Sequence, residues 1–207
     1  MAAFNALVKS KTGPVIAIMA SLFLLASFSA CSTQKIEDVA TRKPQLSLEQ
    51  FFEGQVIAYG IFEDYNQSLS RQFRVNILGT IEGDTLTLEE DFLYDDGETQ
   101  RRVWVITNRG TDEAGITHYE GRADDVVGTA EGKVAGNALN WRYTLALPVD
   151  DDIYHIQFDD WIYQQDEHVA INRARLLKFG IEVGSVTLTF LRGPAAKAIG
   201  PLNLQNW

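Results

Sequence analysis

The sequence predicts an all-β protein, built as a single antiparallel barrel of about nine or ten strands with a short N-terminal helix. Apolar and polar residues alternate with a period of two in many short stretches, which is typical of half-buried antiparallel strands. Turn sequences separate these stretches, and little of the chain has helical spacing, so a barrel or a sandwich is indicated. Recurring glycines favour the barrel, where tightly coiled strands bend, unless they mark loops: Gly121, Gly128, Gly132 and Gly136.

Residues 9–31 have the features of an export signal. The stretch KSKTGPVIAIMASLFLLASFSAC places two lysines before an apolar run, then small residues and the only cysteine of the chain. Its end, from Phe28 to Cys31, resembles the lipobox of bacterial lipoproteins, which are cut before a cysteine that receives diacylglycerol. The resemblance implies that residues 1–30 are removed and that Cys31 is lipidated. Ser32 stands where an Asp would retain a lipoprotein at the inner membrane, which implies the periplasmic face of the outer membrane. Plain secretion and an uncleaved membrane anchor are the alternatives.

The chain left after this cleavage is acidic. It keeps 177 of the 207 residues, enough for one domain, and its net charge changes from −10 to −12 because two lysines are lost. An acidic chain is not expected to bind nucleic acid, which needs a basic surface. The three histidines lack metal-ligand spacing, and the chain has no Gly-rich phosphate loop and no nucleophile elbow. We therefore expect no metal, no cofactor and no recognisable catalytic residue.

Three segments are expected after Cys31. Residues 31–46 are polar without apolar periodicity and are predicted to form a flexible tether. Residues 47–192 form the barrel domain, which begins with a capping box from Ser47 to Gln50 that opens a short helix. Residues 193–207 hold two prolines and no strand pattern, so we expect an irregular tail whose Trp207 either docks on the barrel or stays loose. Residues 172–178 are the one other place where a helical turn competes with a strand.

One hairpin register can be predicted in detail. A three-residue loop, Asp95-Asp96-Gly97, fits a type I turn that ends in a left-handed glycine. This loop pairs Glu90 with Arg102 and places both on the same face as the leucines of the first strand. A loop one residue shorter or longer would leave the Glu90 carboxylate on an apolar face without a charged partner. Because an unpaired buried carboxylate is costly, we expect Arg102 to be the partner of Glu90.

Several short motifs resemble one family of bacterial lipoproteins, grouped as domain of unknown function 3833. The resemblance covers nearly the whole mature chain, and it implies a lipocalin-like fold and no established activity. The genes of that family often lie near those for modifying membrane fatty acids, which hints at a lipid connection. The motifs are Phe52-Glu-Gly54, Ala58-x-Gly60, Leu88-x-Glu90-x-Phe92, Asp96-Gly-Glu98, Arg102-x-Trp104, Tyr119-x-Gly121-x-Ala123-x-Asp125-Val126, Gly136-Asn-Ala138, Asp159-Asp-Trp161 and Asn172-Arg173…Lys178-Phe-Gly180.

Polar and aromatic residues on the inner strand faces are the candidates for a ligand site or for a purely structural barrel interior. Straight alternation from Tyr154 points Asp160 inward and Trp161 outward, whereas a bulge at Asp159-Asp160 reverses them, and the sequence leaves both open. Arg173 and Lys178 either close one end of the barrel or are surface cations. The complete set of candidates is Glu90, Arg102, Trp104, Tyr119, Asp125, Trp141, Tyr143, Asp160, Trp161, Arg173 and Lys178.

These observations predict an outer-membrane lipoprotein that binds or handles an apolar or amphipathic small molecule, such as a fatty acid or lipid, in the periplasm. Small barrels often enclose one ligand among aromatic side chains with a few placed polar groups. A structural or assembly lipoprotein that docks an unknown protein partner through its barrel surface is the alternative, and a lipid-modifying enzyme is the third. An unfilled aromatic-lined cavity favours the first, an exposed apolar patch the second, and a carboxyl of raised pKa in a cleft the third.

Overall fold

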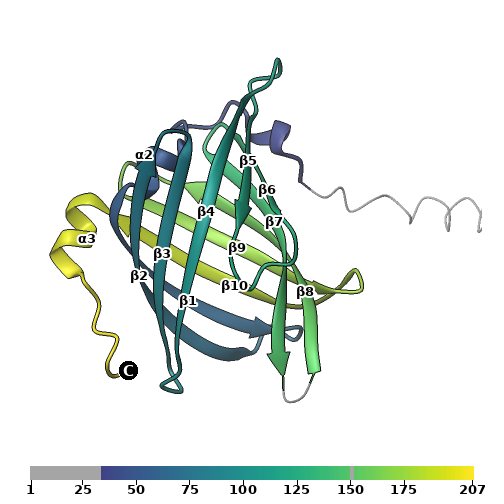
Figure 1. The fold of residues 1–207 in the computed structure, drawn as a ribbon, viewed down its shortest axis with the longest axis vertical. Helices are drawn as coiled ribbons and strands as arrows, with labels where there is room; N and C mark the ends of the chain where they lie inside the picture. Colours follow the sequence, from purple (N-terminus) through teal and green to yellow (C-terminus); the bar gives the residue numbers. More distant parts are fainter. Residues whose placement is uncertain (1–33, 150–151) are drawn as a thin grey trace, which may run out of the picture. The chain divides into compact units, whose positions relative to one another are not determined.

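Ten antiparallel strands follow one another around a closed barrel in the computed structural model of the protein (Figure 1). The structure describes residues 34–149 and 152–207, so the predicted signal segment and Cys31 lie outside the described residues. The chain from Lys35 to Trp207 forms one compact unit. Consecutive strands are hydrogen-bonded neighbours, and the first strand closes the barrel against the last. The predicted single antiparallel barrel is therefore confirmed, with ten strands: β1 (Gly54–Asp64), β2 (Leu69–Glu82), β3 (Thr85–Tyr94), β4 (Thr99–Thr111), β5 (Thr117–Arg122), β6 (Ala130–Ala135), β7 (Ala138–Val149), β8 (Asp152–Gln164), β9 (Val169–Lys178) and β10 (Ile181–Arg192).

Alternation along each strand places one set of side chains in the barrel interior. In β2, for example, Phe73, Val75 and Ile77 are buried, whereas the residues between them are not. Residues 172–178, where a helical turn competes with a strand in the sequence, belong to β9 and pair with both β8 and β10. Hydrogen bonds to the two neighbouring strands therefore hold this segment in the extended conformation, and the helical alternative is wrong.

The short helix α2 (Leu48–Phe52) covers one end of the barrel (Figure 1). It begins as predicted, because the Ser47 side chain accepts a hydrogen bond from the backbone N–H of Gln50 at 3.3 Å. Phe51 and Phe52 are both buried. The Phe52 ring packs edge-to-face on Phe190 of β10, with 5.1 Å between ring centroids. The helix is thus held by its apolar face against the barrel core.

The segment before α2 packs on the outside of the barrel. A 3-10 helix, η1 (Ile36–Val39), buries Ile36 against the outward-facing Trp161. Further on, the backbone N–H of Leu46 donates to the carbonyl of Gly136 at 2.8 Å, and the Leu46 side chain is buried in the core. The prediction of a flexible tether up to residue 46 is therefore wrong for the part from Lys35 onward. Single apolar residues such as Ile36 have no periodicity to reveal them, and the surface that buries them comes from a distant strand.

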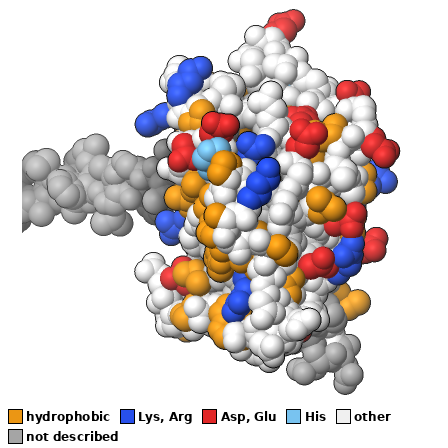
Figure 2. Space-filling model, turned by 90° about the vertical axis from the view of Figure 1, so that its left-hand side faces the viewer, with side chains coloured by type: hydrophobic (Ala, Val, Ile, Leu, Met, Phe, Trp, Pro, Cys, Tyr) orange, Lys and Arg blue, Asp and Glu red, His pale blue; other side chains and the backbone are white. Residues whose placement is uncertain are grey.

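The C-terminal segment is also ordered in a way that the sequence did not predict. Helix α3 (Gly193–Ile199) starts with a proline in its first turn and packs Ala196 over the outward side of β1, where Ile57 is fully buried. Beyond it, Leu202 exchanges two backbone hydrogen bonds with the Asn76 side-chain amide, at 2.8 and 2.9 Å. The Arg74 guanidinium lies 4.5 Å from the ring centroid of Trp207, so that the terminal residue docks on the barrel. Hydrophobic, acidic and basic side chains are interspersed on the side of the molecule where α3 lies (Figure 2).

Candidate functional site

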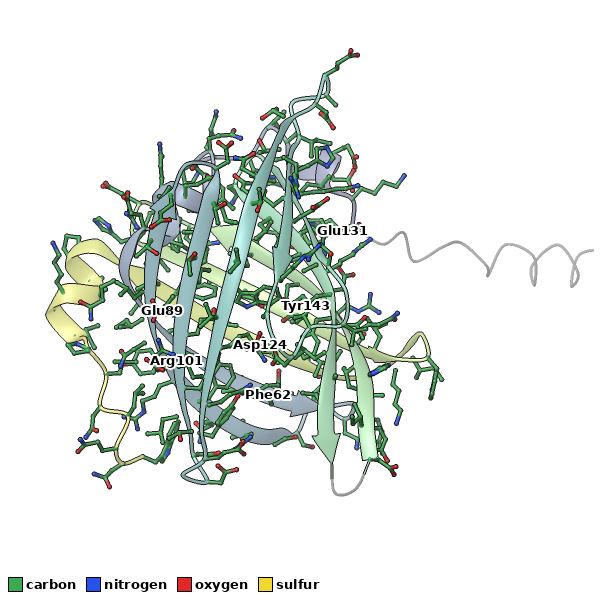
Figure 3. The ribbon with its side chains drawn as sticks, viewed as in Figure 1. Phe62, Glu89, Arg101, Asp124, Glu131 and Tyr143 are labelled. Carbon is green, nitrogen blue, oxygen red and sulfur yellow. The ribbon has the colours of Figure 1, made fainter. Side chains whose placement is uncertain are left out.

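The barrel interior contains a cavity of about 210 Å³ that is partly open to the outside. Leu48 and Phe52 of α2 line one end of it, and aromatic and aliphatic side chains from the strands line the rest. Figure 3 shows Phe62 and Tyr143 among the side chains inside the barrel, whereas Glu89 belongs to the outer face. The volume is large enough for several water molecules or for a comparable part of an organic ligand. The few ionisable groups on the wall therefore decide what the cavity can hold.

Two tryptophans and a tyrosine form the aromatic part of the wall. The Trp104 ring packs edge-to-face on Trp141 and on Tyr143, with centroid distances of 5.5 and 5.2 Å. The indole of Trp141 lies over Gly121 and Gly132, where an added Cβ would come within 2.4 Å of its ring atoms. These two glycines, singled out in the sequence as barrel positions, therefore make room for an aromatic side chain on a third strand.

The predicted hairpin between β3 and β4 is confirmed residue by residue. Glu90 pairs with Arg102 and Leu88 pairs with Trp104. The three-residue turn is closed by two backbone hydrogen bonds: the Tyr94 N–H donates to the Glu98 carbonyl at 2.9 Å, and the Gly97 N–H donates to the Tyr94 carbonyl at 3.0 Å. Gly97 has a φ of 87°. All four paired side chains line the cavity, as the alternation requires.

The expected ion-pair partner of Glu90 is wrong, because Arg102 bonds to Asp125 instead. The guanidinium Nε and Nη2 donate to both carboxylate oxygens of Asp125, at distances from 2.6 to 3.1 Å. Asp125 lies in the loop between β5 and β6, and this loop adds to the edge of β7 through bonds such as Val127 N–H to the Thr144 carbonyl at 2.8 Å. A folded-over loop, which no strand pattern predicts, thus delivers the carboxylate that neutralises Arg102.

Glu90 has an unusual electrostatic environment as a result. Burial inside the barrel raises the pKa of Glu90 from 4.5 to about 7, and the nearby Arg102 charge offsets only part of that rise, while the Asp125 charge adds to it. The Glu90 side chain is not sealed off, because it borders the cavity and is reached by water there.

Asp160 is a second buried acid on the cavity wall. The pairing of β8 with both neighbours runs through Asp160 without a bulge, so that Asp160 points inward and Trp161 outward. Burial raises the pKa of Asp160 to about 7, although a hydrogen bond from the Tyr143 hydroxyl and the charge of Arg102 act in the opposite direction. The Asp160 side chain is only 8% exposed, and its Oδ1 has no hydrogen-bond partner. Straight alternation therefore answers the question that the sequence left open.

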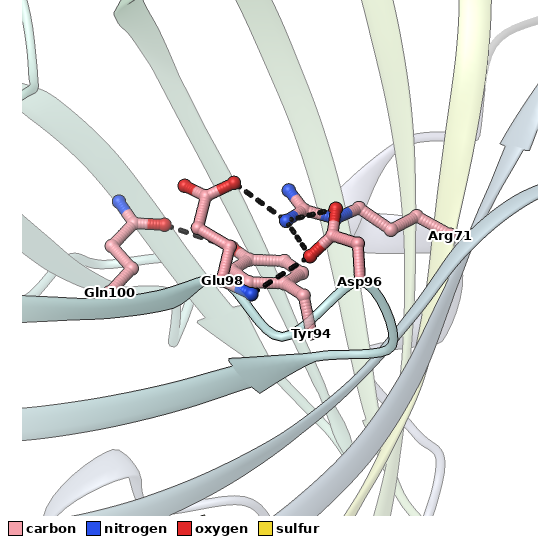
Figure 4. Close-up of polar contacts among 5 residues, drawn as sticks. All are labelled: Arg71, Tyr94, Asp96, Glu98 and Gln100. Atoms are coloured by element: carbon pink, nitrogen blue, oxygen red, sulfur yellow. Dashed lines mark hydrogen bonds and ion pairs between the residues drawn. The ribbon is translucent and has the colours of Figure 1, made fainter. Parts of the chain in front are cut away.

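A cluster of polar residues borders the cavity beside the turn between β3 and β4 (Figure 4). Arg71 donates to Asp96 at 2.7 Å and to Glu98 at 2.6 Å, and its guanidinium lies 3.6 Å from the ring centroid of Tyr94. The Tyr94 hydroxyl in turn donates to the Gln100 side chain at 2.8 Å, and both of these residues line the cavity. Sequence reasoning missed this cluster, because Arg71 reads as an ordinary polar residue near the start of a strand.

The remaining candidates lie away from the cavity. Tyr119 is buried near α2, where its hydroxyl donates to Glu49 at 3.0 Å. Burial alone would raise the pKa of Glu49, but its hydrogen bonds, including those from Asn108 and Tyr119, outweigh burial and lower it. Arg173 is exposed on β9, whereas the Lys178 ammonium lies 3.7 Å from the ring centroid of Tyr154. Neither cation lines the cavity.

Within residues 34–149 and 152–207, no group of three or more His, Cys, Asp or Glu residues is arranged to hold a metal ion. The same part of the chain contains no helix with the length and apolar composition needed to cross a membrane. The chemistry of the described site therefore belongs to Glu90, Arg102, Asp125 and Asp160 together with the aromatic wall.

Comparison with known proteins agrees with this fold. A solved S-type phycobiliprotein lyase from Guillardia theta superposes with a TM-score of 0.54 at 13% identity, covering 77% of this chain and 98% of that one. This similarity supports the lipocalin-like architecture of the barrel. No curated protein sequence matches the chain. A family model described as a protein of unknown function, DUF3833, matches residues 25–192, which is most of the chain. The protein therefore belongs to the DUF3833 family.

Proposed function

We propose that the barrel binds an apolar or amphipathic small molecule, with lipids as the ligand class. The observation that carries this proposal is the cavity of about 210 Å³, whose wall is mostly aromatic and aliphatic with a few polar groups. A barrel that served only as a scaffold would be expected to fill its interior with side chains. The similarity of the fold to a phycobiliprotein lyase is consistent with a small-molecule role.

A direct titration tests the binding proposal. N-phenyl-1-naphthylamine, a neutral apolar fluorophore, is added to the delipidated domain without residues 1–31, and saturable binding is expected near micromolar Kd, about −8 kcal/mol. Ala174→Leu, which adds a larger side chain to the buried cavity wall, should weaken binding. Arg173→Leu introduces the same side chain at the preceding position, which is exposed on the outside of the barrel, and should leave binding unchanged. Equal binding by both variants, or no saturable signal at all, would contradict the proposal.

We propose further that the mature protein is anchored by Cys31 at the periplasmic face of the outer membrane. The support is the sequence of residues 9–31, which matches an export signal followed by a lipid-accepting cysteine. Mass spectrometry of the mature N-terminus should find a diacylglyceryl group on Cys31, and Cys31→Ser should abolish fractionation with outer membranes. Unchanged fractionation of the variant would show that the anchor lies elsewhere.

A second candidate function is catalysis on a bound lipid. The observation that favours it is the presence of two carboxyl groups in the cavity whose pKa values are raised to about 7, since general acids and bases need a pKa near the working pH. Incubation of the protein with a bacterial lipid extract, followed by mass spectrometry, would reveal new products. These products should disappear in Glu90→Gln or Asp160→Asn if the acids carry the reaction, whereas binding without new products leaves the carrier function.

A further inference from the structure

The polar groups of the cavity are short of hydrogen-bond donors. The Asp160 Oδ1 atom is buried and has no partner, and the same holds for the Asn172 Oδ1 atom on the neighbouring strand β9, in a side chain that is only 4% exposed. Both residues line the cavity. Buried acceptors almost always receive a hydrogen bond in folded proteins, and a buried acceptor without a donor lowers the stability of the fold. A ligand that brings a donor into the cavity would satisfy the Asp160 carboxylate.

Several of the donors on the wall are already engaged. Arg102 is the one basic residue among the described side chains that line the cavity, and its Nε and Nη2 both bond to Asp125. The Tyr143 hydroxyl donates to Asp160, and the Tyr94 hydroxyl donates to Gln100. An entering carboxylate would therefore have to share Arg102 with Asp125, which already accepts hydrogen bonds from Nε and Nη2.

The charges lead to the same conclusion. Among the described residues of this wall, Arg102 carries the one positive charge, and it faces three carboxyl groups, those of Glu90, Asp125 and Asp160. A second anion in this surrounding would be repelled, whereas a neutral or cationic donor would be attracted. Burial is the main cause of the raised pKa values of Glu90 and Asp160, and the charge of Arg102 offsets only part of each rise.

We propose that the cavity takes an amphiphile whose polar end donates hydrogen bonds and carries no negative charge, that is, a hydroxyl or a protonated amine rather than a carboxylate. This inference rests on the proposed function, because it specifies the ligand of the same cavity. The buried, unpartnered Asp160 Oδ1 is the expected acceptor, and the aromatic wall is the expected contact for the chain.

Three ligands that differ only in their polar end test the proposal. Decanol, decylamine and decanoate are each used, below micelle-forming concentrations and at pH 8, to displace N-phenyl-1-naphthylamine from the domain without residues 1–31. We expect decanol and decylamine to compete at concentrations at least about tenfold lower than decanoate, because like charges in a cavity repel strongly. In the double variant Glu90→Gln, Asp160→Asn this preference should fall to about threefold or less. The matched double variant Glu89→Gln, Asp159→Asn changes the same residue types at the adjacent, outward-facing positions and should keep the full preference.

The possible results separate the inference from the proposed function. Saturable fluorophore binding with decanoate competing as well as the other two ligands would overturn the inference and leave the binding function intact. Absence of fluorophore binding and of competition by any ligand would overturn both. If the interior variant fails to fold by circular dichroism, the comparison of three ligands on the unmodified protein still decides the question.

Discussion

Glu90→Gln should make the protein more stable at pH 8. The carboxyl group of Glu90 ionises near 4.5 when solvated, but the pKa is raised to about 7 in the folded barrel, mainly by burial. Between these values the folded state holds a proton that the unfolded chain has lost. The stability linked to this proton is fully present below about pH 4.5 and is lost as the pH rises through 7.

The size of the effect follows from the shift. One pKa unit corresponds to about 1.4 kcal/mol, so a rise from 4.5 to about 7 sets an upper limit of about 3 kcal/mol. Gln does not ionise, but its amide must also be accommodated on the apolar wall. We therefore expect Glu90→Gln to raise the free energy of unfolding by about 1–3 kcal/mol at pH 8. The difference between the variant and the unmodified protein should be about 2.5 kcal/mol smaller at pH 5, because most of the linked stability is still present there.

Urea unfolding followed by tryptophan fluorescence at pH 5, 6, 7 and 8 measures this difference. The matched control is Glu89→Gln, one residue away on the outer face, where the side chain is 39% exposed and paired with Arg101. It should change stability by less than about 0.5 kcal/mol and keep the pH dependence of the unmodified protein. The reasoning is refuted if Glu90→Gln keeps the full pH dependence, or if it destabilises the protein at pH 8.

Three further substitutions probe packing, pairing and backbone strain. Arg102→Met should lower stability by about 2–4 kcal/mol because it leaves Asp125 without its cation, and adding Asp125→Asn should recover part of the loss in the same urea assay; equal stability of the single variant would contradict the pairing. Gly132→Ala should cost about 1–3 kcal/mol because its methyl group would overlap a tryptophan ring, whereas the exposed neighbour change Lys133→Ala should be nearly neutral. Phe179→Asn should raise the free energy of unfolding by about 1 kcal/mol, because Phe179 is 92% exposed and has a φ of 53° that Asn adopts more easily; a lower free energy of unfolding would show that the aromatic ring has a packing role.

Local patterns in the sequence were enough to determine the strands and one hairpin. The alternation in β3 and β4 and the glycine at the end of a three-residue loop fix which residues pair, because a slip of one residue would turn every side chain to the other face. This is why Glu90 and Arg102 could be placed inside the barrel and opposite each other from sequence alone. The capping residue of α2 was predictable for the same reason, since Ser47 bonds to a residue only three positions away.

The tertiary structure alone decided which groups meet. Arg102 is bound by Asp125, which is 23 residues away in a loop that is positioned by its hydrogen bonds to β7. Trp161 faces outward, yet it is buried, because η1 from the other end of the described chain covers it. Side-chain alternation reports only whether a residue faces the interior or the outside. The pairing of charges and the burial of outward residues depend on loops and terminal segments, whose positions are set by contacts with distant strands rather than by any local repeat.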